Sequence, residues 1–313
     1  MRAVTVVDGN LVVAERPDPE PGIGQILVRV RAAGLNNADL AQRRGGYPAP
    51  AGWPADIPGL ELAGEVVACG PGASRFAAGD RVMAVVGGGG QAELAVIHER
   101  EAMPIPDQLT WAEAGGLPEV YTTAHDALWT QAGLATGERL CVHGAAGGVG
   151  TAAVQLGVAV GARVTATVRT PERRSQVADL GANVIDPEAA AEHGPYDVIL
   201  ELVGASNLKV NLEALARGGR ICVIGLGTGA VGEINLSLLM TRRGRIHGST
   251  LRARPLEGKA AAARLVEAHV LPLFEAGRLT VPIDSTFELD DAVAAYDHFA
   301  VAGKFGKIVL ICG

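Results

Sequence analysis

Short runs of alternating apolar and polar residues fill the first third of the chain, and glycine- and proline-rich turns separate them. The first two runs flank Asp8-Gly9-Asn10, a turn sequence that favours a hairpin. Residues 36–44 can form a short helix, and residues 45–58 form a loop of a length that usually serves function. The runs predict strands over residues 2–7, 11–14, 25–33, 60–68, 80–86 and 91–97. This stretch therefore has the character of a small β-barrel.

From about residue 117 to residue 250, helical and strand patterns alternate, which predicts a doubly wound parallel sheet. The expected strands are residues 140–143, 163–168, 197–203, 219–224 and 245–249. The expected helices are residues 120–131, 151–160 and 171–180, with another between residues 203 and 219. After residue 258 the pattern predicts an alanine-rich helix to about residue 276, an extended piece at 279–283, a helix at 290–300 and a strand at 306–311. We expect this tail to return to the first domain.

A turn poor in Cβ atoms, residues 144–150 (GAAGGVG), joins the strand that starts near Leu140 to the next helix. Strand, glycine turn, helix and strand are the first unit of a dinucleotide-binding fold, in which backbone N–H groups approach a pyrophosphate. In the G-x-G-x-x-G pattern, Ala145 stands at the first glycine, with Gly147 and Gly150 at the others. The alternative is a helix cap without a ligand, but the flanking elements favour a cofactor. The residues expected to hold it are Ala146, Gly147, Gly148 and Val149.

Composition and charge narrow the class of protein. The 313 residues suggest two domains, and 48% apolar with 19% charged residues argues against disorder. A net charge of −7 without a basic run argues against nucleic acid as a partner. No apolar run is long enough to span a bilayer, and the first residues lack a signal peptide's apolar stretch. The cysteines form no C-x-x-C pair, which fits a reducing cytoplasm; they are Cys69, Cys141, Cys222 and Cys312.

Several strings spread over nearly the whole chain resemble the zeta-crystallin-like NADPH:quinone oxidoreductases, a zinc-free branch of the medium-chain dehydrogenase/reductase superfamily. The matching strings are GLNNAD at residues 34–39, QRRGGY at 42–47, PGLELAG at 58–64, GDRV at 79–82, HGAAGGVG at 143–150 and GKFGKIVL at 303–310. The resemblance implies a GroES-like β-barrel catalytic domain of residues 1–117 and 259–313. It also implies a Rossmann NADP-binding domain of residues 118–258, with the cofactor in the cleft against it.

Zinc ligands are missing where zinc-dependent relatives carry them. Asn36 or Asn37 stands in the region of their cysteine, and Leu60 stands where their histidine would be. The four-cysteine cluster of their structural zinc lobe is also absent. A zinc site needs three or four nitrogen or sulfur ligands, so we expect no metal.

Arginines follow the second strand of the predicted cofactor domain, where NAD-dependent enzymes place an acid. Arg169, Arg173 and Arg174 can hold a 2′-phosphate, or they can be solvated residues at a helix start. Arg173 matches the position where relatives carry a phosphate-binding lysine, which favours NADPH. The aromatic or histidine that relatives often place against the phosphate is replaced by Pro187.

The resemblance also assigns the reacting site. Asn36 and Tyr47 would lie beside the nicotinamide and the acceptor, although Asn36 can be only a helix cap and Tyr47 only a packed loop aromatic. Thr123 would contact the nicotinamide end. The rest of the cofactor groove would be lined by Gly225, Leu226, Thr250 and Leu251.

The expected activity is zinc-independent hydride transfer from NADPH to a quinone or small activated enone. An enoyl-thioester reductase with Tyr47 as proton donor remains open, as does a dedicated biosynthetic enzyme on the same scaffold. A further alternative is a crystallin-like structural or nucleic-acid-binding protein. Relatives pair through the edge of the Rossmann sheet, here residues 245–250, so we expect a homodimer.

Overall fold

The computed structural model describes residues 1–313, and the chain divides into two compact units. The first unit comprises Met1–Thr122, Leu251–Ala302 and Lys307–Gly313, and the second comprises Thr123–Thr250 and Gly303–Gly306. These bounds differ from the expected divisions after residues 117 and 258. The short piece Gly303–Gly306 joins the second unit because the Gly306 amide donates to the Ala146 carbonyl at 2.9 Å.

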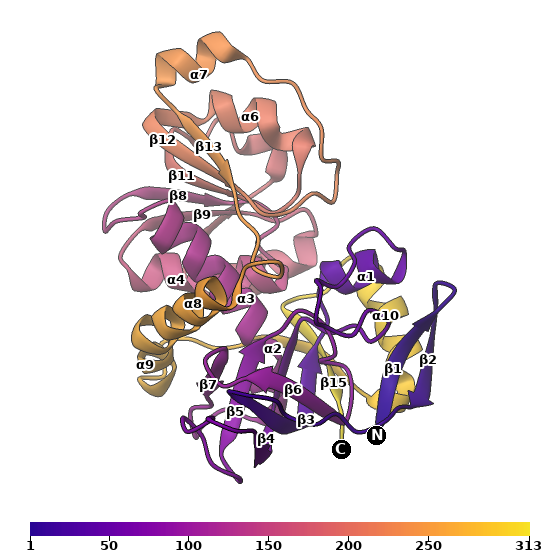
Figure 1. Cartoon of the computed structure of the whole chain (residues 1–313). Helices are drawn as coiled ribbons and strands as arrows, with labels where there is room; N and C mark the ends of the chain where they lie inside the picture. The colour runs from indigo at the N-terminus through magenta and orange to yellow at the C-terminus, as the bar shows by residue number, and fades with distance from the viewer. The chain divides into compact units, whose positions relative to one another are not determined.

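The first unit is built on a seven-stranded sheet with the order β14-β15-β3-β4-β5-β7, and β6 pairs with β3. All of these pairings are antiparallel except that of β14 with β15. Its strands are β3 (Gln25–Gly34), β4 (Glu61–Cys69), β5 (Arg81–Val85), β6 (Leu94–His98), β7 (Ala102–Pro104), β14 (Ile283–Glu288) and β15 (Lys307–Ile311). The terminal strand β15 therefore lies beside β3, as the returning tail requires (Figure 1).

Short helices and a separate hairpin complete the first unit. The hairpin is β1 (Arg2–Val7) with β2 (Asn10–Glu15), and the proline-rich loop after α1 contains no helix or strand. The buried core takes alternate apolar residues of β3, such as Ile26, Val28 and Val30, and the inner face of α10, including Tyr296. The helices are α1 (Asn37–Arg43), α2 (Trp111–Gly116), α8 (Leu256–His269), α9 (Leu271–Glu275) and α10 (Ala292–Ala300).

The second unit is a six-stranded parallel sheet with the order β10-β9-β8-β11-β12-β13. Within this unit, α6 and α7 cover one face of the sheet and α4 covers the other (Figure 1). The strands are β8 (Arg139–Val142), β9 (Arg163–Thr167), β10 (Asn183–Ile185), β11 (Tyr196–Glu201), β12 (Leu215–Val223) and β13 (Arg245–Gly248). The helices are α4 (Gly148–Ala159), α5 (Arg174–Ala178), α6 (Leu208–Glu213) and α7 (Leu236–Arg242). The predicted doubly wound sheet is confirmed.

Several elements differ from the pattern-based prediction. The helix expected over residues 120–131 is α3 (Pro118–His125) continued by a π-helical segment, Asp126–Gln131. The long helix after residue 258 is two helices, α8 and α9, with Pro272 in the first turn of the second. A proline cannot donate the interior hydrogen bond of a continuous helix. Helices α2 and α7 and strands β7 and β10 were not predicted, because each is too short to show a period. The extended piece expected at residues 279–283 lies earlier than the observed strand β14 (Ile283–Glu288). No helix has the length and apolarity that crossing a membrane requires.

Candidate functional site

The glycine turn lies between β8 and α4 and has the backbone shape of an anion cradle. Gly144 adopts a φ of +67°, a conformation that glycine takes readily. A Cβ on Gly150 would stand 2.5 Å from the Gly144 carbonyl oxygen, so only glycine allows this close approach. At Gly147, the N-cap of α4, a Cβ would meet only the Gly144 oxygen, at 3.6 Å. The open side and the uncapped N–H groups of α4 fit the pyrophosphate of a dinucleotide.

Close to this turn in the sheet is a buried hydrogen-bond network of polar side chains that the sequence analysis did not predict. Glu201, at the end of β11, accepts from the Asn211 side chain at 2.6 Å and from the Val203 and Gly204 amides. The Asn211 amide oxygen is 2.7 Å from Nε2 of His143. Burial lowers the pKa of His143, which favours the neutral ring. An acid that ends an apolar strand was the signal available in the sequence.

Nδ1 of His143 completes this hydrogen-bond network with a contact to the hydroxyl of Thr167, at 3.0 Å. The network therefore links the carboxyl ends of β8, β9 and β11, the edge of an open parallel sheet at which ligands bind. These hydrogen bonds connect the end of β8, which leads into the glycine turn, to the ends of β9 and β11.

The three arginines after β9 have different surroundings. Arg174 is occupied, since it donates to the Val168 carbonyl and forms an ion pair with Asp186. Arg173 donates from Nε to the Gly303 carbonyl at 2.5 Å and from a terminal nitrogen to Gln176. Arg169 is exposed and makes no hydrogen bond or ion pair within the chain. Of the predicted phosphate ligands, Arg169 has its whole guanidinium available.

The other predicted groove residues of the second unit lie at strand ends or on α3. Gly225 follows β12, and a Cβ there would collide with the Leu202 backbone. Leu226 is 57% exposed, a high value for a leucine, and Thr250 is exposed at the end of this unit. Thr123 is buried in α3.

In the first unit, the side chain of Asn36 is fixed at both of its amide atoms. Its Nδ2 donates to Glu61 at 2.9 Å, and its Oδ1 accepts from Lys307 Nζ at 2.8 Å. Lys307 also donates to the Leu35 carbonyl at 2.7 Å and pairs with Glu61 at 2.6 Å. Glu61 Oε2 accepts the Glu119 amide at 2.8 Å. Both members of the ion pair are buried, so the network sets one orientation of Asn36.

Asp39 lies next to Asn36 in the same unit. Its carboxylate accepts the Asn36 amide at 2.8 Å and the Gly59 amide at 3.0 Å. Burial raises the pKa of Asp39 from 3.8 to about 7, against the lowering effect of these hydrogen bonds. Because the folded state holds a proton that the unfolded state releases, the contribution of Asp39 to stability is present below its usual pKa and is lost as the pH rises toward 7.

Tyr47 lies in the proline-rich loop and is half-buried. The guanidinium of Arg252 lies 4.9 Å from its ring centroid and donates to its backbone carbonyl at 2.7 Å. Burial raises the pKa of Tyr47, as does the charge of Glu119, while Arg252 lowers it. The structure thus brings Tyr47 together with an arginine that the sequence analysis did not select.

Leu251 lies in the first unit, where it lines a small pocket with Thr122 and the buried pair Lys259–Glu101. The Nζ of Lys259 also lies 4.5 Å from the Trp53 ring centroid. No group of three or more His, Cys, Asp or Glu side chains that could hold a metal ion occurs in residues 1–313.

Comparison with known proteins finds two family matches along the chain. Residues 22–107 match the alcohol dehydrogenase GroES-like domain family, and residues 148–267 match the zinc-binding dehydrogenase family. The quinone oxidoreductase of Rattus norvegicus is 33% identical over 99% of this chain and 98% of its own.

Solved structures show the same fold. An alcohol dehydrogenase superfamily protein from Novosphingobium aromaticivorans has a TM-score of 0.87 at 30% identity, with both chains covered completely. A mycobacterial protein complexed with NADPH has a TM-score of 0.88 at 26% identity, with 99% of this chain and 100% of its own covered.

A GroES-like domain and a Rossmann domain with a glycine turn in one chain define a medium-chain dehydrogenase/reductase, an oxidoreductase that uses a nicotinamide cofactor. Within that superfamily, the chain belongs to the zeta-crystallin-like quinone oxidoreductases.

Proposed function

We propose that the protein transfers a hydride from NADPH to a quinone or a small activated enone, without zinc. The full-length similarity to quinone oxidoreductases carries this proposal. The bound nicotinamide would supply the hydride. Gly147, Gly148 and Val149 would hold the pyrophosphate by backbone N–H groups, with Ala146 beside them. Asn36, fixed at both amide atoms, would orient the reacting groups.

A panel of acceptors tests the activity. NADPH oxidation is followed by absorbance with benzoquinone, phenanthrenequinone, a simple enone and crotonyl-CoA, and each assay is repeated with NADH. We expect turnover of quinones or the enone with NADPH. Turnover of crotonyl-CoA alone would contradict this and favour enoyl-thioester reduction with Tyr47 as the proton donor. The half-buried Tyr47 keeps that second candidate open.

We propose that Arg169 and Arg173 make the enzyme prefer NADPH. Arg169→Ala or Arg173→Ala would remove charge-assisted hydrogen bonds to the 2′-phosphate, each worth about 1.5–3 kcal/mol. The KM for NADPH should therefore rise about tenfold or more, while the KM for NADH stays nearly constant. Arg174→Ala is the matched control, because its guanidinium is bound to Asp186. An equal rise for both cofactors in the Arg169 and Arg173 variants would refute the assignment.

Thr123, Gly225, Leu226, Thr250 and Leu251 remain proposed contacts of the rest of the cofactor.

For quaternary structure, we propose a homodimer formed along β13, the edge strand of the second sheet. Helix α7, which directly precedes β13, leaves Leu236 and Met240 exposed, and these apolar side chains support it. A monomer mass by light scattering at micromolar protein would contradict it. Four free cysteines are consistent with a cytoplasmic enzyme acting on a small molecule.

A further inference from the structure

Arg252 is a buried cation without a carboxylate partner. Its side chain donates to the carbonyls of Gly87 at 2.8 Å and Tyr47 at 2.7 Å, and to the amide oxygen of Gln42. The residue is 2% exposed, and no acidic side chain lies within ion-pair distance of it. Burying a charge that is paired only with neutral acceptors costs folding free energy, so we expect the position of Arg252 to serve a function.

The other buried cations of the chain are neutralised. Lys307 pairs with Glu61, and Lys259 pairs with Glu101. Arg220, which is also buried, pairs with Glu138. Arg252 is therefore set apart by its surroundings, and burial indeed lowers its pKa.

The contacts of Arg252 converge on the loop that carries Tyr47. Its guanidinium lies against the Tyr47 ring and holds the Tyr47 carbonyl. Gln42, which accepts from Arg252, donates to the Ala55 carbonyl at 3.1 Å near the other end of the loop. The guanidinium thus fixes both the backbone and the ring of Tyr47. A cation at this distance also favours a negative charge on the phenol.

We propose that Arg252 positions Tyr47 and stabilises its phenolate, which makes Tyr47 the proton donor to the reduced acceptor. This inference rests on the proposed function. Hydride transfer adds two electrons and one hydrogen to the quinone or enone and leaves an anion. The Tyr47 O–H bond then breaks, its proton joins that anion, and the phenolate remains beside Arg252 until solvent returns a proton.

Opposing charges act on Tyr47. Burial and Glu119 disfavour its phenolate, and Arg252 favours it. Asp39 and Glu119 in turn favour the charged form of Arg252. Removing the cation should therefore make Tyr47 harder to ionise, while removing the Glu119 charge should make it easier.

The four tyrosines of the chain allow a direct test. Tyr121, Tyr196 and Tyr296 are fully buried, so Tyr47 should ionise first. In protein labelled with ¹³C at tyrosine Cζ, NMR signals are followed against pH, and Tyr47→Phe assigns the Tyr47 signal. In Arg252→Gln we expect the Tyr47 midpoint to move to higher pH by about one pH unit. Arg252→Lys should keep most of the wild-type midpoint. Arg264→Gln, a half-buried arginine that bonds the Ala102 carbonyl, is the control and should change nothing.

The pH dependence of kcat provides the second reading. If Tyr47 donates the proton, the alkaline limb of kcat should move with the Tyr47 midpoint in Arg252→Gln, and KM for NADPH should stay constant. An unchanged Tyr47 midpoint would overturn the inference, and so would a moved midpoint with an unmoved kcat profile. Absence of turnover with every acceptor would instead overturn the proposed function, while the NMR titration would still decide whether Arg252 acts on Tyr47.

The wild-type protein offers a test that needs no arginine variant to fold. The Arg252 Nε–H signal should shift with the ionisation of Tyr47, and that shift should vanish in Tyr47→Phe. A signal that stays constant through the Tyr47 midpoint would overturn the inference.

Discussion

Lys307→Met is expected to lower the free energy of unfolding by about 3–5 kcal/mol, because it leaves the Glu61 carboxylate buried without its cation. Glu61 is 0% exposed and Lys307 is 3% exposed, and their charged atoms are 2.6 Å apart. The substitution also removes the donor that holds Asn36 Oδ1, so kcat should fall together with stability. Chemical denaturation followed by tryptophan fluorescence measures the loss.

A second substitution separates lost charge pairing from lost packing. Glu61→Gln in the Lys307→Met background removes the unpaired charge and should restore a large part of the lost stability. Lys209→Met makes the same side-chain change at an exposed lysine and should alter stability by less than about 0.5 kcal/mol. If the Lys307→Met loss were as small as that of Lys209→Met, the network would not hold this unit together.

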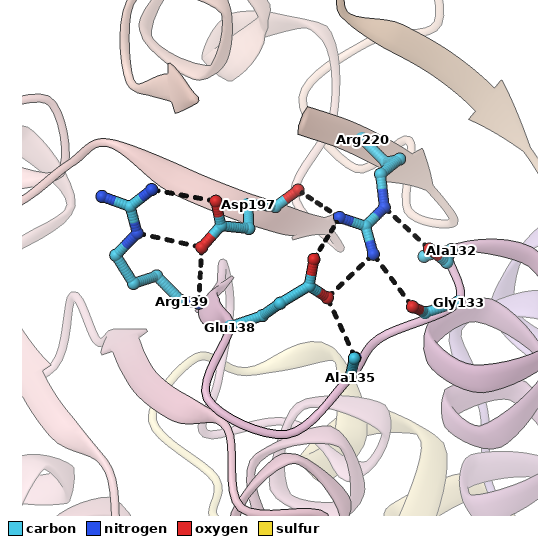
Figure 2. Close-up of polar contacts among 7 residues, drawn as sticks. All are labelled: Ala132, Gly133, Ala135, Glu138, Arg139, Asp197 and Arg220. Carbon is cyan, nitrogen blue, oxygen red and sulfur yellow. Dashed lines mark hydrogen bonds and ion pairs between the residues drawn. The ribbon is translucent and has the colours of Figure 1, made fainter. Parts of the chain in front are cut away.

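Arg220→Met is expected to lower the free energy of unfolding by about 3 kcal/mol, the second-largest loss after that of Lys307→Met. Figure 2 shows its guanidinium donating to both oxygens of Glu138, to the Asp197 carbonyl and to the carbonyls of Ala132 and Gly133. The last two carbonyls follow the π-helical segment, so the cation also neutralises a helix C-terminus. Without Arg220, these acceptors would lose their donor in a site largely closed to water.

Arg139→Met is the matched control for Arg220→Met. Arg139 binds Asp197 through two nitrogens at 2.9 Å in the same group of residues (Figure 2). Its side chain is 36% exposed, however, so water can replace the ion pair and the loss should be about 1 kcal/mol or less. Equal losses for the two variants, measured by thermal unfolding, would show that burial does not decide the strength of these pairs.

Local sequence was enough to predict the elements whose backbone is dictated within a few residues. The hairpin around Asp8-Gly9-Asn10 is present, as is the helix that begins after Asn36. The glycine turn has the predicted shape because only glycine adopts the φ of Gly144 without strain and leaves room at Gly150. By contrast, the helix expected after residue 258 is two helices, since the alanine-rich pattern conceals the break at Pro272.

The sequence by itself determined the fold class and the glycine turn, and its resemblance to a known family pointed to Asn36 and Tyr47 as the residues to propose for the reacting site. Only the tertiary structure decided their partners. Lys307 reaches Asn36 across 271 residues of chain, and Arg252 reaches Tyr47 across 205. A turn is fixed by steric limits on neighbouring residues, which the sequence displays. A buried charge takes its partner from strand order and packing, and these exist only once the chain has folded.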